Sequence, residues 1–123
     1  MKGNVLVADN LSSKTLEGKK NQVAVNLTWF PEISYKTKIK EPTHFIMAFL
    51  ENSTNKNKEH VDYNFLIINS SNATVYRQSL HSGWGIEQAS VMLNPDEKYK
   101  AVVEIDGIVF QPVKPDRVLF ELY

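Results

Sequence analysis

The sequence predicts an all-β protein, a two-sheet antiparallel sandwich of about seven or eight strands. Apolar residues recur with a period of two through most of the chain, as they do in strands that have one buried face. Clusters of Asn, Ser, Gly, Pro and Asp separate these alternating runs, and no helical periodicity extends beyond two turns. A series of short strands between turn signals is typical of a sandwich or a barrel.

The chain of 123 residues is expected to form one domain, because its length lies in the usual single-domain range. A first strand is expected at residues 4–8, followed by a polar linker or surface loop at residues 9–21. Residues 22–123 then form the body of the sandwich. Within this body the period-two pattern predicts strands at residues 22–30, 43–51, 60–69, 73–79, 86–93, 98–105 and 118–122.

The clearest of these strands also predict the core. In residues 22–30 every second side chain from Val23 to Trp29 is apolar, and Pro31 ends the strand. Residues 43–51 are apolar on both faces, which indicates a central strand. The side chains expected to be mostly buried are Trp29, Phe45, Phe49, Phe65, Ile67, Tyr99, Ala101, Val103 and Phe120.

Turn-forming residues predict where the hairpins reverse. The Asn-Ser-Ser-Asn segment at 69–72 marks one turn. The Asp-Gly pair at 106–107 predicts a two-residue hairpin turn, with residues 108–110 beginning the returning arm. Pro112 and Pro115 indicate a loop before the last strand, because proline cannot donate a hydrogen bond to a neighbouring strand.

One segment carries a family resemblance. Residues 93–103, a polar turn followed by Tyr99 and an alternating strand, resemble a corner of immunoglobulin-like and fibronectin-like sandwiches. The resemblance implies that the Tyr99 hydroxyl bonds back to the backbone of the preceding loop. The chain has no cysteine, so it lacks the Cys…Trp…Cys frame of antibody domains. Residues 60–83 resemble modules of exported archaeal surface proteins, which implies a location outside the cytoplasm.

Composition excludes several functional classes. Lys plus Arg and Asp plus Glu number 14 each, so the net charge is zero and a nucleic-acid partner is not expected. No apolar run approaches the roughly 18 residues that a membrane span requires. The absence of cysteine removes thiol catalysis, cysteine-based zinc sites and iron–sulfur clusters.

Five N-x-[ST] sequons indicate glycosylation outside the cytoplasm, at Asn10, Asn26, Asn52, Asn69 and Asn72. The alternative is that Asn and Ser simply concentrate in turns. Residues 1–7 are too short and too polar for a signal peptide, so the protein is either cytoplasmic or its signal peptide is absent from this sequence. The sequons favour the second alternative, an extracytoplasmic or cell-surface location.

Histidines offer a candidate metal site. His60 opens one predicted strand, His81 lies in the predicted loop 80–85, and Asp62 lies on the same side of its strand as His60. These residues could converge on copper or zinc, with Asp62 as a carboxylate ligand. The alternative is that the histidines are merely solvated, which is also the expectation for His44.

Trp84 is a candidate contact residue, because it lies between Gly83 and Gly85 in a loop and aromatic side chains dominate binding sites. The alternative is that its indole folds back and caps one end of the sandwich.

No catalytic motif is present, so no enzymatic activity and no cofactor are expected. The predicted function is a non-catalytic module for interaction or assembly, with a protein or surface glycan as partner, or a second copy of itself. Two alternatives remain: a small copper- or zinc-binding protein, and a filament subunit that adds the strand at 4–8 to a neighbouring sheet edge.

Overall fold

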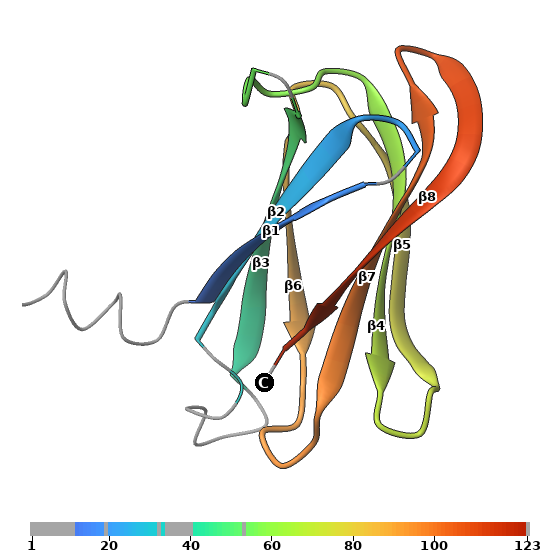
Figure 1. Cartoon of the computed structure of the whole chain (residues 1–123). Helices are drawn as coiled ribbons and strands as arrows, with labels where there is room; N and C mark the ends of the chain where they lie inside the picture. Colours follow the sequence, from blue (N-terminus) through green and yellow to red (C-terminus); the bar gives the residue numbers. More distant parts are fainter. Residues whose placement is uncertain (1–11, 19, 32, 34–40, 53, 123) are drawn as a thin grey trace, which may run out of the picture.

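The structure is a computed structural model that describes residues 12–18, 20–31, 33, 41–52 and 54–122. These residues form eight β-strands arranged as two antiparallel sheets of four strands each (Figure 1). The strands are β1 Ser12–Glu17, β2 Val23–Phe30, β3 Pro42–Glu51, β4 Val61–Asn69, β5 Thr74–Ser82, β6 Ile86–Met92, β7 Tyr99–Ile108 and β8 Gln111–Glu121. The predicted two-sheet antiparallel sandwich is confirmed.

The strand order within each sheet shows how the chain moves between the layers. One sheet has the order β1-β2-β3-β6, and the other has the order β5-β4-β7-β8. The chain crosses between the sheets after β3, β5 and β6, and the other connections join neighbouring strands of one sheet. The edge strands are therefore β1 and β6 in one sheet, and β5 and β8 in the other.

Alternate side chains of both sheets meet in one core, as the period-two pattern predicts. β3 lies between β2 and β6, which confirms residues 43–51 as a central strand. All nine predicted core side chains are buried: Trp29, Phe45, Phe49, Phe65, Ile67, Tyr99, Ala101, Val103 and Phe120. Within the described residues, no helix is long and apolar enough to cross a membrane.

The polar stretch at residues 9–21 is not a linker throughout, because Ser12–Glu17 forms β1. This edge strand pairs with β2 in register from Ser12↔Trp29 to Glu17↔Ala24. Only Leu16 among its residues packs against the core. An edge strand with one apolar contact has no period-two signal, so its backbone pairing was not visible in the sequence. The strand expected at residues 4–8 lies outside the described residues.

The hairpin turn predicted at residues 106–107 is also misplaced. β7 continues to Ile108, and the register shifts between Ile105 and Gly107 at a β-bulge. Gly107 lies opposite Asp62, whose side chain occupies the space that a Cβ at position 107 would need. The Asp-Gly pair therefore forms a bulge, and the chain reverses two residues later.

The actual turn is Val109-Phe110, between the paired residues Ile108 and Gln111. Both turn residues have positive φ, 50° for Val109 and 64° for Phe110. Two successive positive φ angles define a type I′ turn, which normally requires Asn or Gly. The expected loop containing Pro112 and Pro115 belongs to β8, where proline is tolerated because β8 is an edge strand.

Tyr99 makes the contact that its sequence context implied. The backbone N–H of Asn94 donates a hydrogen bond of 3.0 Å to the Tyr99 hydroxyl. The buried ring thus ties the β6–β7 loop to the start of β7.

Candidate functional site

One end of the sandwich carries the β3–β4, β5–β6 and β7–β8 connections, at the top of Figure 1. His60 lies immediately before β4, and its backbone is hydrogen bonded to the β5–β6 and β7–β8 connections. Its backbone N–H donates to Gly83 O at 3.4 Å, and its carbonyl accepts from Val109 N–H at 2.7 Å. His60 itself has a φ of 58°, in the left-handed region that is uncommon for residues other than Gly but that Asn, Asp and His adopt more often than the rest.

The structure brings the three predicted metal-site residues together. His81 is in β5, which extends beyond the predicted strand 73–79, and not in a loop. It pairs directly with Asp62 across β4 and β5, so their side chains share the outer face of the sheet. The ring centroids of His60 and His81 are 5.4 Å apart.

A chain of hydrogen bonds runs through these residues. His81 Nδ1 lies 2.7 Å from Asp62 Oδ1, and His81 Nε2 lies 3.2 Å from His60 Nδ1. An ionised carboxylate can only accept, so the Nδ1–H of His81 donates to Asp62. In its neutral form His81 therefore presents a lone pair at Nε2, to which His60 Nδ1–H donates.

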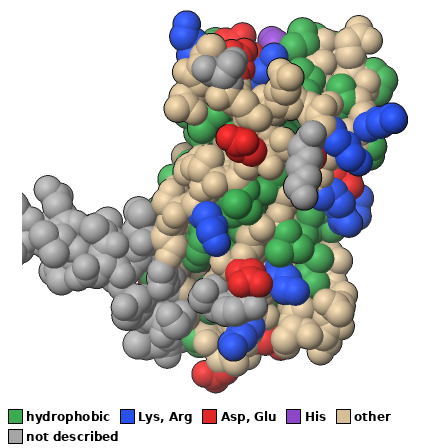
Figure 2. Space-filling view, viewed as in Figure 1, with side chains coloured by type: hydrophobic (Ala, Val, Ile, Leu, Met, Phe, Trp, Pro, Cys, Tyr) green, Lys and Arg blue, Asp and Glu red, His purple; other side chains and the backbone are tan. Residues whose placement is uncertain are grey.

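Phe110 lies against both imidazole rings. Its ring centroid is 4.5 Å from that of His60 and 5.4 Å from that of His81, and it stacks on His81 with an interplanar angle of 17°. Phe110 is nevertheless 66% exposed. We refer to His60, Asp62, His81 and Phe110 as the histidine cluster. Figure 2 shows a histidine side chain beside apolar groups at this end of the molecule.

A shallow polar hollow of about 310 Å³ adjoins the cluster on the outer face of the sheet, and Asp62, Asn64, Ser79, His81 and Asp106 contribute to its lining. Asn64 is buried, and its amide donates to Glu104 Oε1 at 2.9 Å and to Asp106 Oδ2 at 3.1 Å. The Ser79 hydroxyl donates to Asn64 Oδ1. Ser79 is therefore engaged away from His81, and no Ser–His–Asp arrangement forms among these residues.

Trp84 is 78% exposed, so its indole does not cap the sandwich. Hydrogen bonds fix the backbone of the β5–β6 loop that carries Trp84. Gly85 has a φ of 86°, its N–H donates to Ser82 Oγ at 2.9 Å, and its carbonyl accepts from Phe49 N–H at 2.8 Å. A Cβ at position 85 would collide with the backbone of Lys58. The backbone of the β5–β6 loop is thus fixed on both sides of Trp84, and the indole points toward solvent.

The sequons differ in how their asparagine side chains are engaged. Asn72 is exposed, with a φ of 63° in the β4–β5 turn. Asn69 Oδ1 accepts hydrogen bonds from the N–H groups of Ser71 and Ala73, both at 2.9 Å. The side-chain oxygen of Asn69 therefore stabilises the turn in which Asn72 is exposed.

The remaining sequons are less accessible or lie elsewhere. Asn26 lies within β2, where its amide donates to Thr15 Oγ1 at 2.8 Å and to Ser13 Oγ at 3.2 Å. Asn52 has a buried side-chain oxygen. Asn10 lies outside the described residues.

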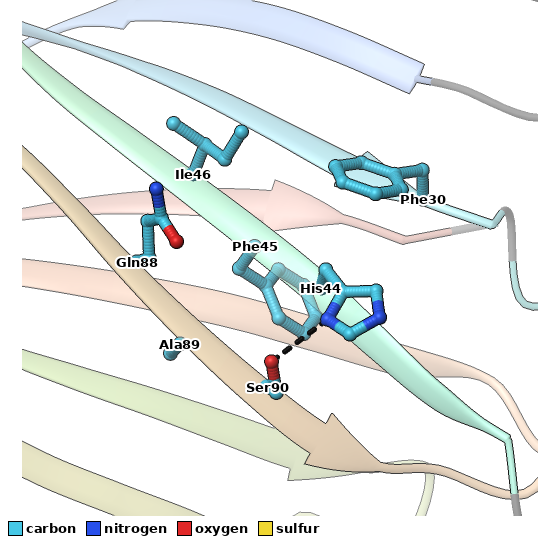
Figure 3. A pocket seen from close by; sticks show the side chains of 7 residues that line it. All are labelled: Phe30, His44, Phe45, Ile46, Gln88, Ala89 and Ser90. Atoms are coloured by element: carbon cyan, nitrogen blue, oxygen red, sulfur yellow. Dashed lines mark hydrogen bonds between the residues drawn. The ribbon is translucent and has the colours of Figure 1, made fainter. Parts of the chain in front are cut away.

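A second hollow, of about 300 Å³, lies on the outer face of β2, β3 and β6 (Figure 3). His44 lines it, with its Nδ1 2.8 Å from Ser90 Oγ and its ring 5.4 Å from that of Phe30. Ile46 and Gln88 complete the outward-facing surface of this hollow. Sequence reasoning missed it, although Phe30 and Ile46, on the outer faces of alternating strands, were its available signal.

Compared with known families, curated proteins and solved structures, the chain matches none of them. Among the described residues, no group of three or more His, Cys, Asp or Glu side chains is arranged to hold a metal ion. The interpretation of function therefore depends on the histidine cluster, the exposed aromatic side chains and the two hollows.

Proposed function

We propose that this domain is a non-catalytic recognition module, located at the cell surface or otherwise outside the cytoplasm. It binds a protein partner through the end of the sandwich that carries Phe110 and Trp84. The observation that carries this proposal is the β7–β8 turn, in which two residues with positive φ present an exposed aromatic ring.

The turn supports a binding role because Val109 and Phe110 adopt positive φ angles that their side chains disfavour. A β-branched or bulky side chain at positive φ costs of order 1–3 kcal/mol, and strained residues of this kind concentrate at functional sites. Val109 is 50% exposed and Phe110 is 66% exposed, so neither recovers this cost by full burial in the core. A surface role for the two side chains accounts for their presence at the turn.

Trp84 extends the same surface. Its neighbour Gly83 is hydrogen bonded to His60, and the ring of His60 packs on Phe110. Exposed aromatic anchors on rigid backbone are typical of protein-binding surfaces, because little conformational entropy is lost when they are covered. The two exposed aromatic side chains, Phe110 and Trp84, are the reason for proposing a protein partner.

The non-catalytic part of the proposal is supported by the way polar side chains are used. His81 bonds to Asp62 and His60, while Ser79 bonds to Asn64. The hollow beside them is shallow and open to water, whereas catalysis relies on groups that are preorganised in a water-restricted site.

Site-specific photo-cross-linking in the native host tests this proposal. A benzophenone amino acid would replace Phe110 or Trp84 in turn, and Val75 in the control. Val75 is 46% exposed and lies at the opposite end of the sandwich, next to the β4–β5 turn. We expect a discrete protein adduct from positions 110 and 84, in the extracytoplasmic fraction, and none from position 75.

Two outcomes contradict the proposal. Equal adducts from all three positions would show non-specific proximity. Adducts confined to glycan, or cross-linking only in the cytoplasmic fraction, would show that the partner class or the location is wrong.

A further inference from the structure

We propose that His60 and His81 form a binding site for one Zn²⁺ or Cu²⁺ ion, bound through His60 Nδ1 and His81 Nε2. The inference is independent of the proposed function, because the ion would bind the free domain. His60 lies just before β4 and His81 lies in β5. The two residues are 21 positions apart in the chain, and the pairing of β4 with β5 brings them together.

The separation of the two nitrogen atoms matches the requirement of a shared ion. His60 Nδ1 and His81 Nε2 are 3.2 Å apart. Zn²⁺–nitrogen bonds of about 2.0–2.1 Å that enclose a tetrahedral angle place the two nitrogens about 3.3–3.4 Å apart. The angle of about 90° in tetragonal Cu²⁺ sites places them somewhat closer, so the observed separation lies between the two requirements. Small rotations of the rings, together with transfer of the His60 proton from Nδ1 to Nε2 through solvent, would direct both lone pairs at one ion and leave both rings neutral.

Asp62 would act on the ion indirectly, and not as the direct ligand expected from the sequence. Its carboxylate accepts from His81 Nδ1–H at 2.7 Å, which leaves the lone pair of His81 at Nε2. A carboxylate behind a metal-binding imidazole fixes the tautomer and the ring orientation and makes the ligand more basic. Gly107 leaves the space in which the Asp62 side chain is held.

Phe110 shapes the same site. It packs against both imidazole rings and thus restricts their rotation, while its own face remains largely exposed. Among the described residues, no third His, Cys, Asp or Glu side chain completes the site. The other coordination positions would be taken by water, and imidazole pairs of this type suit Zn²⁺ and Cu²⁺ and not Mg²⁺ or Ca²⁺.

The test is calorimetric titration of the full chain, without a histidine tag, with Zn²⁺ and separately with Cu²⁺. We expect one equivalent of at least one of these ions to bind. His60→Ala and His81→Ala each remove a direct ligand, so each should weaken that binding by more than the loss of an outer-sphere partner, which costs about 10–100-fold. The matched control is His44→Ala, because His44 is in the other sheet and should leave the affinity unchanged.

A measurement on the unsubstituted protein guards against misfolded variants. In imidazole-detected NMR, added Zn²⁺ should shift the His60 and His81 ring signals and leave those of His44 in place. For Cu²⁺, electron paramagnetic resonance should show coupling to two imidazole nitrogens.

A second pair of variants separates the roles of Asp62. Asp62→Ala should weaken binding about 10–100-fold, as the loss of an outer-sphere partner does. Asp62→Asn keeps an oxygen that can accept from His81 Nδ1–H, and it should therefore retain more affinity than the alanine variant. The proposal is overturned if neither ion binds, if the His60 and His81 variants bind like the unsubstituted chain, or if His44→Ala loses as much affinity as they do.

Discussion

Two buried tyrosines of the core differ in what their hydroxyl groups contact. The Tyr99 hydroxyl accepts a hydrogen bond from Asn94 N–H. The Tyr63 ring packs against Phe49 with a centroid distance of 5.0 Å, and its hydroxyl is buried without a hydrogen-bond partner among the described residues. Burial, and then the nearby charge of Glu87, raise the pKa of Tyr63 far above its ordinary value of 10.0.

The first prediction concerns alkaline pH. Because the folded-state pKa of Tyr63 is raised, only the unfolded chain loses this proton just above pH 10.0. The free energy of unfolding should then fall with rising pH, with a contribution of about 1.4 kcal/mol per pH unit from this residue. Tyr63→Phe should remove that contribution, and urea unfolding across this pH range measures it. An unchanged slope in the variant would show that the hydroxyl is solvated.

The same pair of tyrosines gives a second prediction at neutral pH. Tyr99→Phe leaves Asn94 N–H without its acceptor, so it should lower the free energy of unfolding by about 0.5–1.5 kcal/mol. Tyr63→Phe should be neutral or stabilising, since it removes a buried polar group that has no partner in the described structure. Urea unfolding of both variants decides the matter, and equal losses would contradict the assignment of their contacts.

At the scale of single elements, the β7–β8 turn departs most clearly from local preference. Val109 and Phe110 occupy positions where Asn and Gly are preferred, while the Asp-Gly pair of the same hairpin is used at a bulge. Gly107 accommodates Asp62, which holds His81. The hairpin therefore positions the histidine cluster through both its bulge and its turn.

Replacing the turn tests whether its conformation is strained. The double variant Val109→Asn, Phe110→Gly restores a preferred type I′ sequence, and the free energy of unfolding should rise by about 1–3 kcal/mol. Phe110→Gly alone should raise it less, since Val109 stays at positive φ. Chemical denaturation provides the measurement. A less stable double variant would indicate that the stacking of Phe110 on the imidazoles outweighs the backbone strain.

Turns and strands should also differ in glycosylation. In a host that modifies N-x-[ST] sequons, Asn72 should carry glycan, because its side chain is exposed in a turn. Asn26 should remain unmodified, since its amide is bonded to β1 within the sheet. Glycopeptide mass spectrometry measures site occupancy, and modification of Asn26 in preference to Asn72 would contradict this order.

On the scale of the whole molecule, the two sheets are held together by one core to which both contribute aromatic rings. Phe45 of one sheet and Phe65 of the other pack edge to face, with centroids 5.3 Å apart. Phe65 is fully buried, so Phe65→Ala should lower the free energy of unfolding by about 3–5 kcal/mol. Leu119→Ala is the control, because Leu119 is 49% exposed and should change stability by no more than about 0.5 kcal/mol. Thermal and urea unfolding measure both variants, and similar losses would mean that Phe65 is not central to the core.

The sequence by itself determined the core and most of the strands, because the alternation of side chains in a strand is a local property. Val23 to Trp29 and Tyr99 to Val103 display their buried faces without reference to any other part of the chain. The same reasoning could not find β1, since an edge strand is made by backbone pairing and needs little apolar burial. It also pointed to His60, at the start of a strand, and to His81, placed in a loop, as residues that could converge on a metal ion.

Only the tertiary structure decided how the hairpin and the histidine cluster are built. The inward-facing pairs Phe65↔Val103 and Tyr63↔Ile105 set the register of β4 against β7, and the bulge that follows moves the turn beyond Gly107. That register brings Phe110 onto the imidazoles, while the pairing of β4 with β5 aligns Asp62 with His81. These contacts join residues far apart in the chain, and they follow from the burial of the core face as a whole and not from any local preference.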